Sequence, residues 1–138
     1  AAGQTIAFSY PLRHMKITSS YGMRMHPVLG EYRFHHGIDL ASHRDTVKSI
    51  LTGKVLSAGY SHTLGYYVLT RHGDMSILYG HLSAIWVKQG SHLQQAQPLG
   101  RTGNTGMATG DHLHLEVRLL GRTINPVLLF KQLEKLNQ

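Results

Sequence analysis

Cysteine is absent from this chain of 138 residues. Its absence excludes disulfide bonds, thiolate zinc sites and a cysteine nucleophile. Proline is scarce, with 4 residues, and no apolar run approaches the roughly 18 residues that a membrane-spanning helix needs. We therefore expect no transmembrane segment. Any metal site in this chain must use histidine and carboxylate ligands.

Acidic residues are also few: 7 aspartates and glutamates stand against 14 lysines and arginines, which gives a net charge of +7 with neutral histidines. The basic residues are scattered along the chain. This charge favours a polyanionic partner, such as nucleic acid, anionic lipid or an acidic cell-wall polymer, without choosing among them. Nucleic acid ranks last because the chain lacks a basic helix, interleaved aromatics and zinc-finger spacing. We expect no nucleic-acid partner.

Glycine, by contrast, is frequent, with 15 residues that separate short runs of β-branched, aromatic and leucine residues. These runs predict strands at residues 47–51, 54–60, 66–72, 76–79 and 112–120. Gly73 and Asp74 lie between two of these runs and are typical of a tight hairpin. The pattern predicts a mainly β domain with an antiparallel sheet.

One helix is predicted at the C-terminus, over about residues 126–137. Asn125 can cap it, and Pro126 suits its first position. Its apolar stripe, which we expect to pack against the sheet, consists of Leu129, Phe130, Leu133 and Leu136. We expect one domain over residues 1–138, with a core over about residues 11–130 and a β-rich α+β architecture.

The segment at residues 111–118 alternates strictly between apolar and polar residues. One face of a strand here would be apolar, with Leu113, Leu115 and Val117. The opposite face would be polar, with His112, His114, Glu116 and Arg118. A rigid strand with two neighbouring imidazoles is suited to holding a metal ion. Two solvent-facing histidines would give the same pattern.

A second cluster surrounds Gly37. In an extended chain His35 and Asp39 share one side, whereas His36 lies on the other side with Ile38 and Leu40, which should face the core. We expect His36 to be structural. Gly37 would leave room for a ligand to approach the backbone.

His35, Asp39 and one histidine of the 112–114 pair would supply two imidazoles and one carboxylate. Zn²⁺ with three protein ligands keeps a fourth position for water, which is the catalytic arrangement. Such a metal lowers the pKa of the water towards ~7 and polarises a substrate carbonyl. A closed structural site is the alternative, but it would not need the further histidines of this chain.

Two other features are less specific. The glycine-rich run at residues 100–110 lacks the Gly-Lys-Ser/Thr ending of a phosphate-binding loop, so we expect a turn-rich loop that leads into the histidine strand. His81 closes a strand-like run where the chain is expected to turn. By itself His81 fits an ordinary surface or core histidine.

Three segments together resemble the signature of the lysostaphin-type (LytM-domain) zinc metallopeptidases, a family of peptidoglycan endopeptidases. They are His35-x-x-x-Asp39, Tyr79-Gly80-His81-Leu82-Ser83 and Gly110-Asp111-His112-Leu113-His114-Leu115-Glu116-Val117. Two flanking segments, at residues 17–27 and 124–126, also match, and all of them occur in family order. Residues 42–46 depart from the family's usual Pro- and Gly-containing turn. Four residues ahead of His35 could line the groove or be structural: Arg24, His26, Tyr32 and Arg33.

The resemblance implies a compact antiparallel β-sheet with a substrate groove. It also implies one zinc ion held by His35, Asp39 and His114. His81 and His112 would be the catalytic pair, which assists a metal-activated water and stabilises the tetrahedral intermediate. The implied reaction is hydrolysis of peptide bonds in peptidoglycan crosslinks, an anionic cell-wall substrate. A non-hydrolytic cell-wall-binding or regulatory module of the same fold is the alternative.

Peptidoglycan as a partner implies an extracytoplasmic location, in the periplasm, at the cell envelope or in the medium. Residues 1–4 contain no basic segment ahead of an apolar one, so export would depend on a signal removed from the chain or lying outside it. We expect a monomer. Three scissile bonds remain open at this stage: a D-Ala–diaminopimelate crosslink, a glycine bridge or another stem-peptide bond.

Overall fold

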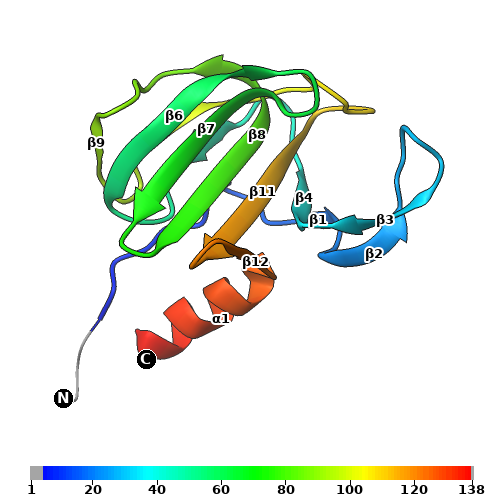
Figure 1. The fold of residues 1–138 in the computed structure, drawn as a ribbon. Helices are drawn as coiled ribbons and strands as arrows, with labels where there is room; N and C mark the ends of the chain where they lie inside the picture. Colours follow the sequence, from blue (N-terminus) through cyan, green and yellow to red (C-terminus); the bar gives the residue numbers. More distant parts are fainter. Residues whose placement is uncertain (1–4, 138) are drawn as a thin grey trace.

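The computed structural model describes residues 5–137, which form an antiparallel β-sheet with one helix near the C-terminus (Figure 1). In chain order the elements are β1 (Ile17–Ser19), β2 (Gly22–Met25), β3 (Tyr32–His35), β4 (Gly37–Ala41), β5 (Thr46–Lys48), β6 (Gly53–Ser61), β7 (Gly65–His72), β8 (Met75–Ile85), β9 (His92–Leu93), β10 (Pro98–Thr102), β11 (His112–Leu119), β12 (Arg122–Ile124) and α1 (Pro126–Leu136). Within the described residues no helix has the length and apolar character needed to cross a membrane.

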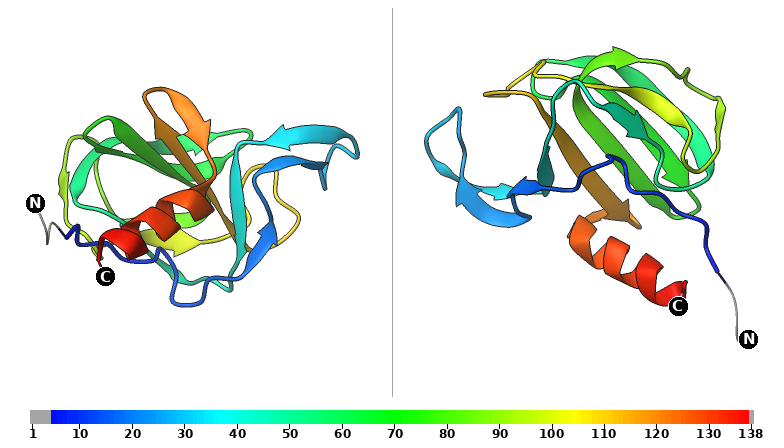
Figure 2. Two further views of the ribbon diagram at one scale, coloured as in Figure 1. Left: turned by 90° about the horizontal axis from the view of Figure 1, so that it is seen from below. Right: turned by 180° about the vertical axis from the view of Figure 1, so that it is seen from behind.

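The main sheet follows the order β1-β4-β11-β8-β7-β6-β9. β10 pairs with both β5 and β8, and β12 pairs with β11. All of these pairings are antiparallel, as the sequence predicts. β2 and β3 form a separate hairpin, which projects to one side of the sheet in Figure 1. Figure 2 shows α1 beside β12, at a distance from that hairpin.

One face of the central strands is the hydrophobic core. Val117, Ile77, Thr70 and Val55 are successive cross-strand neighbours on β11, β8, β7 and β6, and all four are fully buried. Side chains directly opposite each other across a sheet point to the same face, and the next residue along each strand points to the other face. The rows on either side of this one therefore lie on the open face of the sheet.

The predicted helix is present as α1. The Val127 N–H donates to Asn125 Oδ1 at 3.0 Å, and Pro126 occupies the first turn. Three residues of the predicted stripe join the core: Leu129, Phe130 and Leu133. The prediction for Leu136 is wrong, because this residue ends the helix and is 37% exposed.

The predicted strands are present, but some of their ends differ. β5 ends at Lys48, because the next two backbone N–H groups bond outside a strand ladder. Ser49 N–H donates to the Gln97 carbonyl, and Ile50 N–H donates to the Tyr79 hydroxyl. The Gly73 turn joins β7 and β8 in an antiparallel hairpin, as predicted.

Two of the expected loops are partly strand. β8 does not end at residue 79 but continues to Ile85, so His81 lies inside a strand and not at a chain turn. The pairing of β10 with β8 stabilises this extension. The same pairing places Gly100–Thr102 in β10, so the expected loop into β11 begins only after Thr102.

Candidate metal centre

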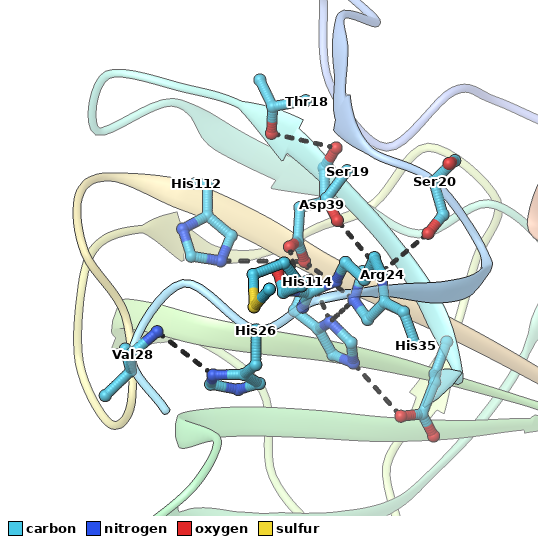
Figure 3. A network of polar contacts seen from close by, with 12 residues as sticks. Thr18, Ser19, Ser20, Arg24, His26, Val28, His35, Asp39, His112 and His114 are labelled. Carbon is cyan, nitrogen blue, oxygen red and sulfur yellow. Dashed lines mark hydrogen bonds and ion pairs between the residues drawn. The ribbon is translucent and has the colours of Figure 1, made fainter. Parts of the chain in front are cut away.

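The three predicted metal ligands come from neighbouring strands. The register of β4 and β11 sets Asp39 opposite His114, and His35 ends β3 two residues before β4 begins. All three residues are buried, and each offers a ligand atom within 4.8 Å of the other two. Figure 3 shows their side chains converging, with Arg24 and His112 beside them.

Gly37 makes this register possible. A Cβ at this position would lie 2.2 Å from the Leu115 carbonyl oxygen, far inside van der Waals contact. The interpretation that Gly37 leaves room for a ligand is therefore wrong, because the group that approaches is the backbone of β11. Close approach of β4 to β11 is what carries Asp39 to His114.

The donor atoms have the spacing of a tetrahedral metal site. His114 Nδ1 lies 3.0 Å from Asp39 Oδ1 and 3.3 Å from His35 Nε2, and the Asp39 and His35 atoms are 3.4 Å apart. A tetrahedral zinc ion with bonds of about 2.0–2.1 Å separates its ligands by about 3.3 Å. The observed triangle fits such an ion.

In His35 and His114, the ring nitrogen that points away from Asp39 is hydrogen-bonded, which leaves the other nitrogen available to a metal ion. His35 Nδ1 faces the Ser20 carbonyl at 3.0 Å, and His114 Nε2 faces Glu116 Oε1 at 3.1 Å. A carbonyl or carboxylate oxygen can only accept, so these two nitrogens carry the protons. In the neutral rings that a metal ion requires, the remaining lone pairs, on His35 Nε2 and His114 Nδ1, are those that face Asp39.

Without a metal, His114 is protonated at neutral pH, because its carboxylate partners stabilise the charged ring. Burial acts to lower the pKa of His114, but its hydrogen bonds to Asp39 and Glu116 outweigh burial and raise that pKa to about 9. Burial acts to raise the pKa of Asp39, yet hydrogen bonds from His114 and His35 hold it well below its usual range. Asp39 is therefore ionised and available to a cation at neutral pH.

The two predicted catalytic histidines lie beside this triangle. The His81 and His112 ring centroids are 4.7 Å apart, and His112 Nε2 is 3.7 Å from Asp39 Oδ1. His81 Nδ1 faces the Thr105 carbonyl at 2.7 Å, and His112 Nδ1 faces a backbone carbonyl at 3.0 Å. When these rings are neutral, Nε2 of each therefore keeps a lone pair that can take a proton.

His81 occupies an unusual backbone position. Its φ is 60°, in the left-handed region that side chains rarely adopt, and its N–H donates to the Leu64 carbonyl at 2.7 Å. Such strain is maintained only where surrounding contacts fix it, and it is common at functional sites. Burial lowers the pKa of His81 to about 4, although the Thr105 carbonyl opposes this shift. The ring is therefore neutral at physiological pH.

Two residues contact the metal centre in ways that were not predicted from the sequence. Glu116 orients His114, and the available signal was its position on the same face of the strand, two residues from that histidine. Arg24 reaches Asp39, with Nη2 3.7 Å from Oδ2 (Figure 3). Its Nε is buried and, within the described residues, has no hydrogen-bond partner. Nothing local in the sequence indicates this contact.

A cavity of about 580 Å³ opens over the cluster. It is lined by all five predicted site residues: His35, Asp39, His81, His112 and His114. The upstream residues Arg24, His26 and Arg33 also line it, whereas Tyr32 lies outside and is 71% exposed. His36 is exposed at its rim, where Nδ1 is 3.2 Å from Thr123 Oγ1.

A profile of peptidase family M23 matches residues 33–126, which include His35, Asp39, His81, His112 and His114. This chain belongs to peptidase family M23. The family assignment agrees with the lysostaphin-type resemblance seen in the sequence.

Individual proteins show the same likeness. DD-carboxypeptidase/endopeptidase Mpg of Neisseria meningitidis is 40% identical over 85% of this chain, and peptidoglycan DD-endopeptidase ShyC of Vibrio cholerae is 35% identical over 84%. Among solved structures, a zinc-containing peptidase from Vibrio cholerae is 34% identical, with a TM-score of 0.79 over 86% of this chain and 39% of that one. The catalytic domain of lysostaphin from Staphylococcus simulans is 28% identical, with a TM-score of 0.81 over 91% of this chain and 99% of that one.

The chain spans only part of its curated relatives, 27% of the Neisseria protein and 28% of the Vibrio endopeptidase.

Proposed function

We propose that this chain is the catalytic unit of a zinc-dependent endopeptidase that hydrolyses peptide bonds in bacterial peptidoglycan. The observation that carries the proposal is the triangle of donor atoms on His35, Asp39 and His114, with edges of 3.0, 3.3 and 3.4 Å. These three residues would hold one zinc ion. Bound there, zinc would supply a Lewis acid that polarises the scissile carbonyl and lowers the pKa of water.

His81 and His112 are the proposed acid–base pair. In its neutral form each ring would present Nε2 as a proton acceptor, because its Nδ1 is used by a backbone carbonyl. One Nε2 would accept the proton of the attacking water and afterwards donate it to the leaving amine. The other ring, 4.7 Å away between centroids, would stabilise charge on the tetrahedral intermediate.

The names of the relatives support a particular bond. One curated relative is named a peptidoglycan DD-endopeptidase, and another is named a DD-carboxypeptidase/endopeptidase. We therefore propose a crosslink between D-configured residues as the substrate bond. A cell-wall substrate would place the activity outside the cytoplasm, and the excess of basic over acidic residues suits an anionic polymer.

The test is cleavage of purified peptidoglycan by protein loaded with one equivalent of zinc. Mass spectrometry of the products should show new amino groups at D,D-crosslinks, and a chelator should abolish them. His112→Ala and His81→Ala should each lower kcat/KM by roughly 10²-fold or more, in the range of lost general acid–base catalysis. His92→Ala, at an exposed residue on β9, is the matched control and should be fully active.

Two results would reject the proposal. Fully metallated protein that cleaves no peptidoglycan from several wall types would remove the endopeptidase assignment. A biological effect and wall binding that survive both His112→Ala and His81→Ala would instead favour the non-hydrolytic module.

A further inference from the structure

A row of basic residues crosses the open face of the sheet. Arg118 on β11 is opposite Ser76 on β8, Ser76 is opposite Arg71 on β7, and Arg71 is opposite Lys54 on β6. The neighbouring row, Val117 to Val55, is the buried one, so these four residues point away from the core. The three charged residues, which we call the cationic row, are all exposed: Lys54, Arg71 and Arg118.

The cationic row is not neutralised within the sheet. Across β6, β7, β8 and β11, all of which the structure describes, Glu116 is the only acidic residue. Glu116 Oε2 lies 3.3 Å from Arg118 Nη2, while Oε1 of the same carboxylate is used by His114. Arg71 Nε donates to the Gly73 carbonyl at 3.2 Å, which is a neutral acceptor. The row therefore keeps an excess of positive charge.

A second cavity of about 400 Å³ reaches from Glu116, which contacts His114, to Arg118 at one end of the cationic row. Lys54 and Arg71 continue the row beyond this cavity.

The second cavity shares Leu64 and Glu116 with the metal cavity, so the two cavities adjoin, and together we call them the groove. Ser76 and Arg118 line its far end. Its floor is apolar and aromatic, with Tyr67, Leu69 and Leu78.

Next to the metal centre, the open face of the sheet has no side chain at Gly80. This residue is opposite His114 in the sheet, and a Cβ here would already touch Leu64 and His114 at 3.4–3.5 Å. A larger side chain here would press against Leu64 and His114, both of which line the metal cavity.

Resting on the endopeptidase function, we propose that the cationic row is a substrate subsite that binds a carboxylate of an acidic peptide. His114 and Arg118 are four residues apart on one strand, which is about 13 Å at about 3.3 Å per residue. An extended peptide that covers this distance places its carboxylate three or four residues from the scissile bond. The subsite therefore selects chains with an acidic group at that distance.

The groove favours an acidic peptide over a phosphate polymer. Arginine binds carboxylates through a planar fork of donors, and two of the three row residues are arginines. The apolar floor between the row and the metal centre suits peptide side chains and offers no contact to a polyphosphate backbone. A nucleic acid would also need stacking aromatics along a basic groove, and Tyr67 is the one aromatic residue that lines this cavity.

The test compares crosslinked muropeptides with free carboxylates and the same muropeptides after conversion of the carboxylates to amides. The zinc-loaded wild type should cleave the free-carboxylate form with the higher kcat/KM. In the double variant Lys54→Gln/Arg71→Gln this preference should fall roughly fivefold, mainly through KM, as expected for two surface charge contacts. Arg118 is left in place because it touches Glu116.

The matched control is Lys48→Gln/Lys131→Gln, which removes the same charge from exposed positions on β5 and α1. It should keep the wild-type preference. Equal loss in both double variants would overturn the subsite, because general charge would then explain the effect.

A second readout does not depend on cleavage. Anisotropy of fluorescein-labelled hexaglutamate should show weaker binding to Lys54→Gln/Arg71→Gln than to the control variant, and hexaglutamine should bind to neither. If no muropeptide is cleaved, the endopeptidase function fails while this measurement still decides the subsite. Binding of a twelve-residue oligothymidylate that depends on the row, without binding of hexaglutamate, would overturn the acidic-peptide proposal in favour of a phosphate polymer.

Discussion

His114 uses its two ring nitrogens for different partners. Nδ1 faces Asp39 at 3.0 Å, and Nε2 faces Glu116 at 3.1 Å. A carboxylate behind a ligand histidine fixes its tautomer and makes the ligating nitrogen more basic. Glu116 is thus a positioning residue for the metal centre, since it touches His114 and not the donor triangle.

Replacing Glu116 with alanine should weaken zinc binding by roughly tenfold or more, the usual effect of losing such a partner. Competition against a chromophoric chelator measures this affinity directly. Glu116→Gln, which keeps an acceptor oxygen, should restore part of it. Asp74→Asn, which neutralises a carboxylate in the β7–β8 turn, is the control. Equal zinc affinity in Glu116→Ala and Asp74→Asn would contradict the positioning role.

His81 should make the metal-free protein less stable in acid. Its pKa is 6.5 in the unfolded chain and about 4 in the folded protein, where burial disfavours the charged ring. Between these pH values the unfolded state binds more protons, so the free energy of unfolding falls as the pH drops. The contribution of this residue is on the order of 3 kcal/mol across the window.

Urea unfolding at pH 7 and pH 4.5 measures the effect. The wild type should lose more stability between the two pH values than His81→Gln, which cannot titrate. Similar losses in the two proteins would show that the ring is protonated normally in the folded state.

At the scale of elements, the pairing of β4 with β11 builds the site. The alternation in β11 is a local property, so its two faces are predicted correctly: Leu113, Leu115 and Val117 are fully buried, and the histidine face lines the cavity. The pairing of β11 with β4 depends on a contact between distant parts of the chain, the close approach of the two backbones at Gly37. That approach involves residues about eighty positions apart.

Gly37→Ala should therefore damage both the fold and the metal centre. Its Cβ would lie 2.2 Å from the Leu115 carbonyl, so β4 must move away from β11 and carry Asp39 with it. We expect a loss of roughly 2–4 kcal/mol in the free energy of unfolding, typical of severe steric strain, together with weaker zinc binding. Gly110→Ala, where nothing lies within 4 Å of the added Cβ, is the control and should change neither quantity. Wild-type zinc affinity in Gly37→Ala would contradict the register argument.

At the scale of the whole molecule, the net charge of +7 should raise the rate of association with an anionic wall polymer. Raising the salt from about 0.05 M to about 0.5 M shortens the screening length and should lower kcat/KM on intact peptidoglycan several-fold. A small uncharged peptide substrate should show little change, and zinc content must stay constant. Salt-independent cleavage of the polymer would remove this role for the charge.

The sequence by itself determined the fold class, the apolar and polar faces of β11, the cap of α1 and the exclusion of thiolate chemistry. These follow from residue types and from periods of two or 3.6, which are local properties of the chain. From the residues alone, either His112 or His114 could be the third ligand, and the family resemblance indicated His114. Those ligand and catalytic roles stay predictions until the variants above are measured.

Only the tertiary structure decided the distances among the donor atoms, the left-handed backbone of His81, the contact of Arg24 with Asp39 and the alignment of the cationic row. Each depends on which strands pair and in what register, and register is set by side chains and backbone far apart in the chain. No sequence pattern connects Lys54, Arg71 and Arg118. They form a row because the registers of three antiparallel pairings place them side by side across the sheet.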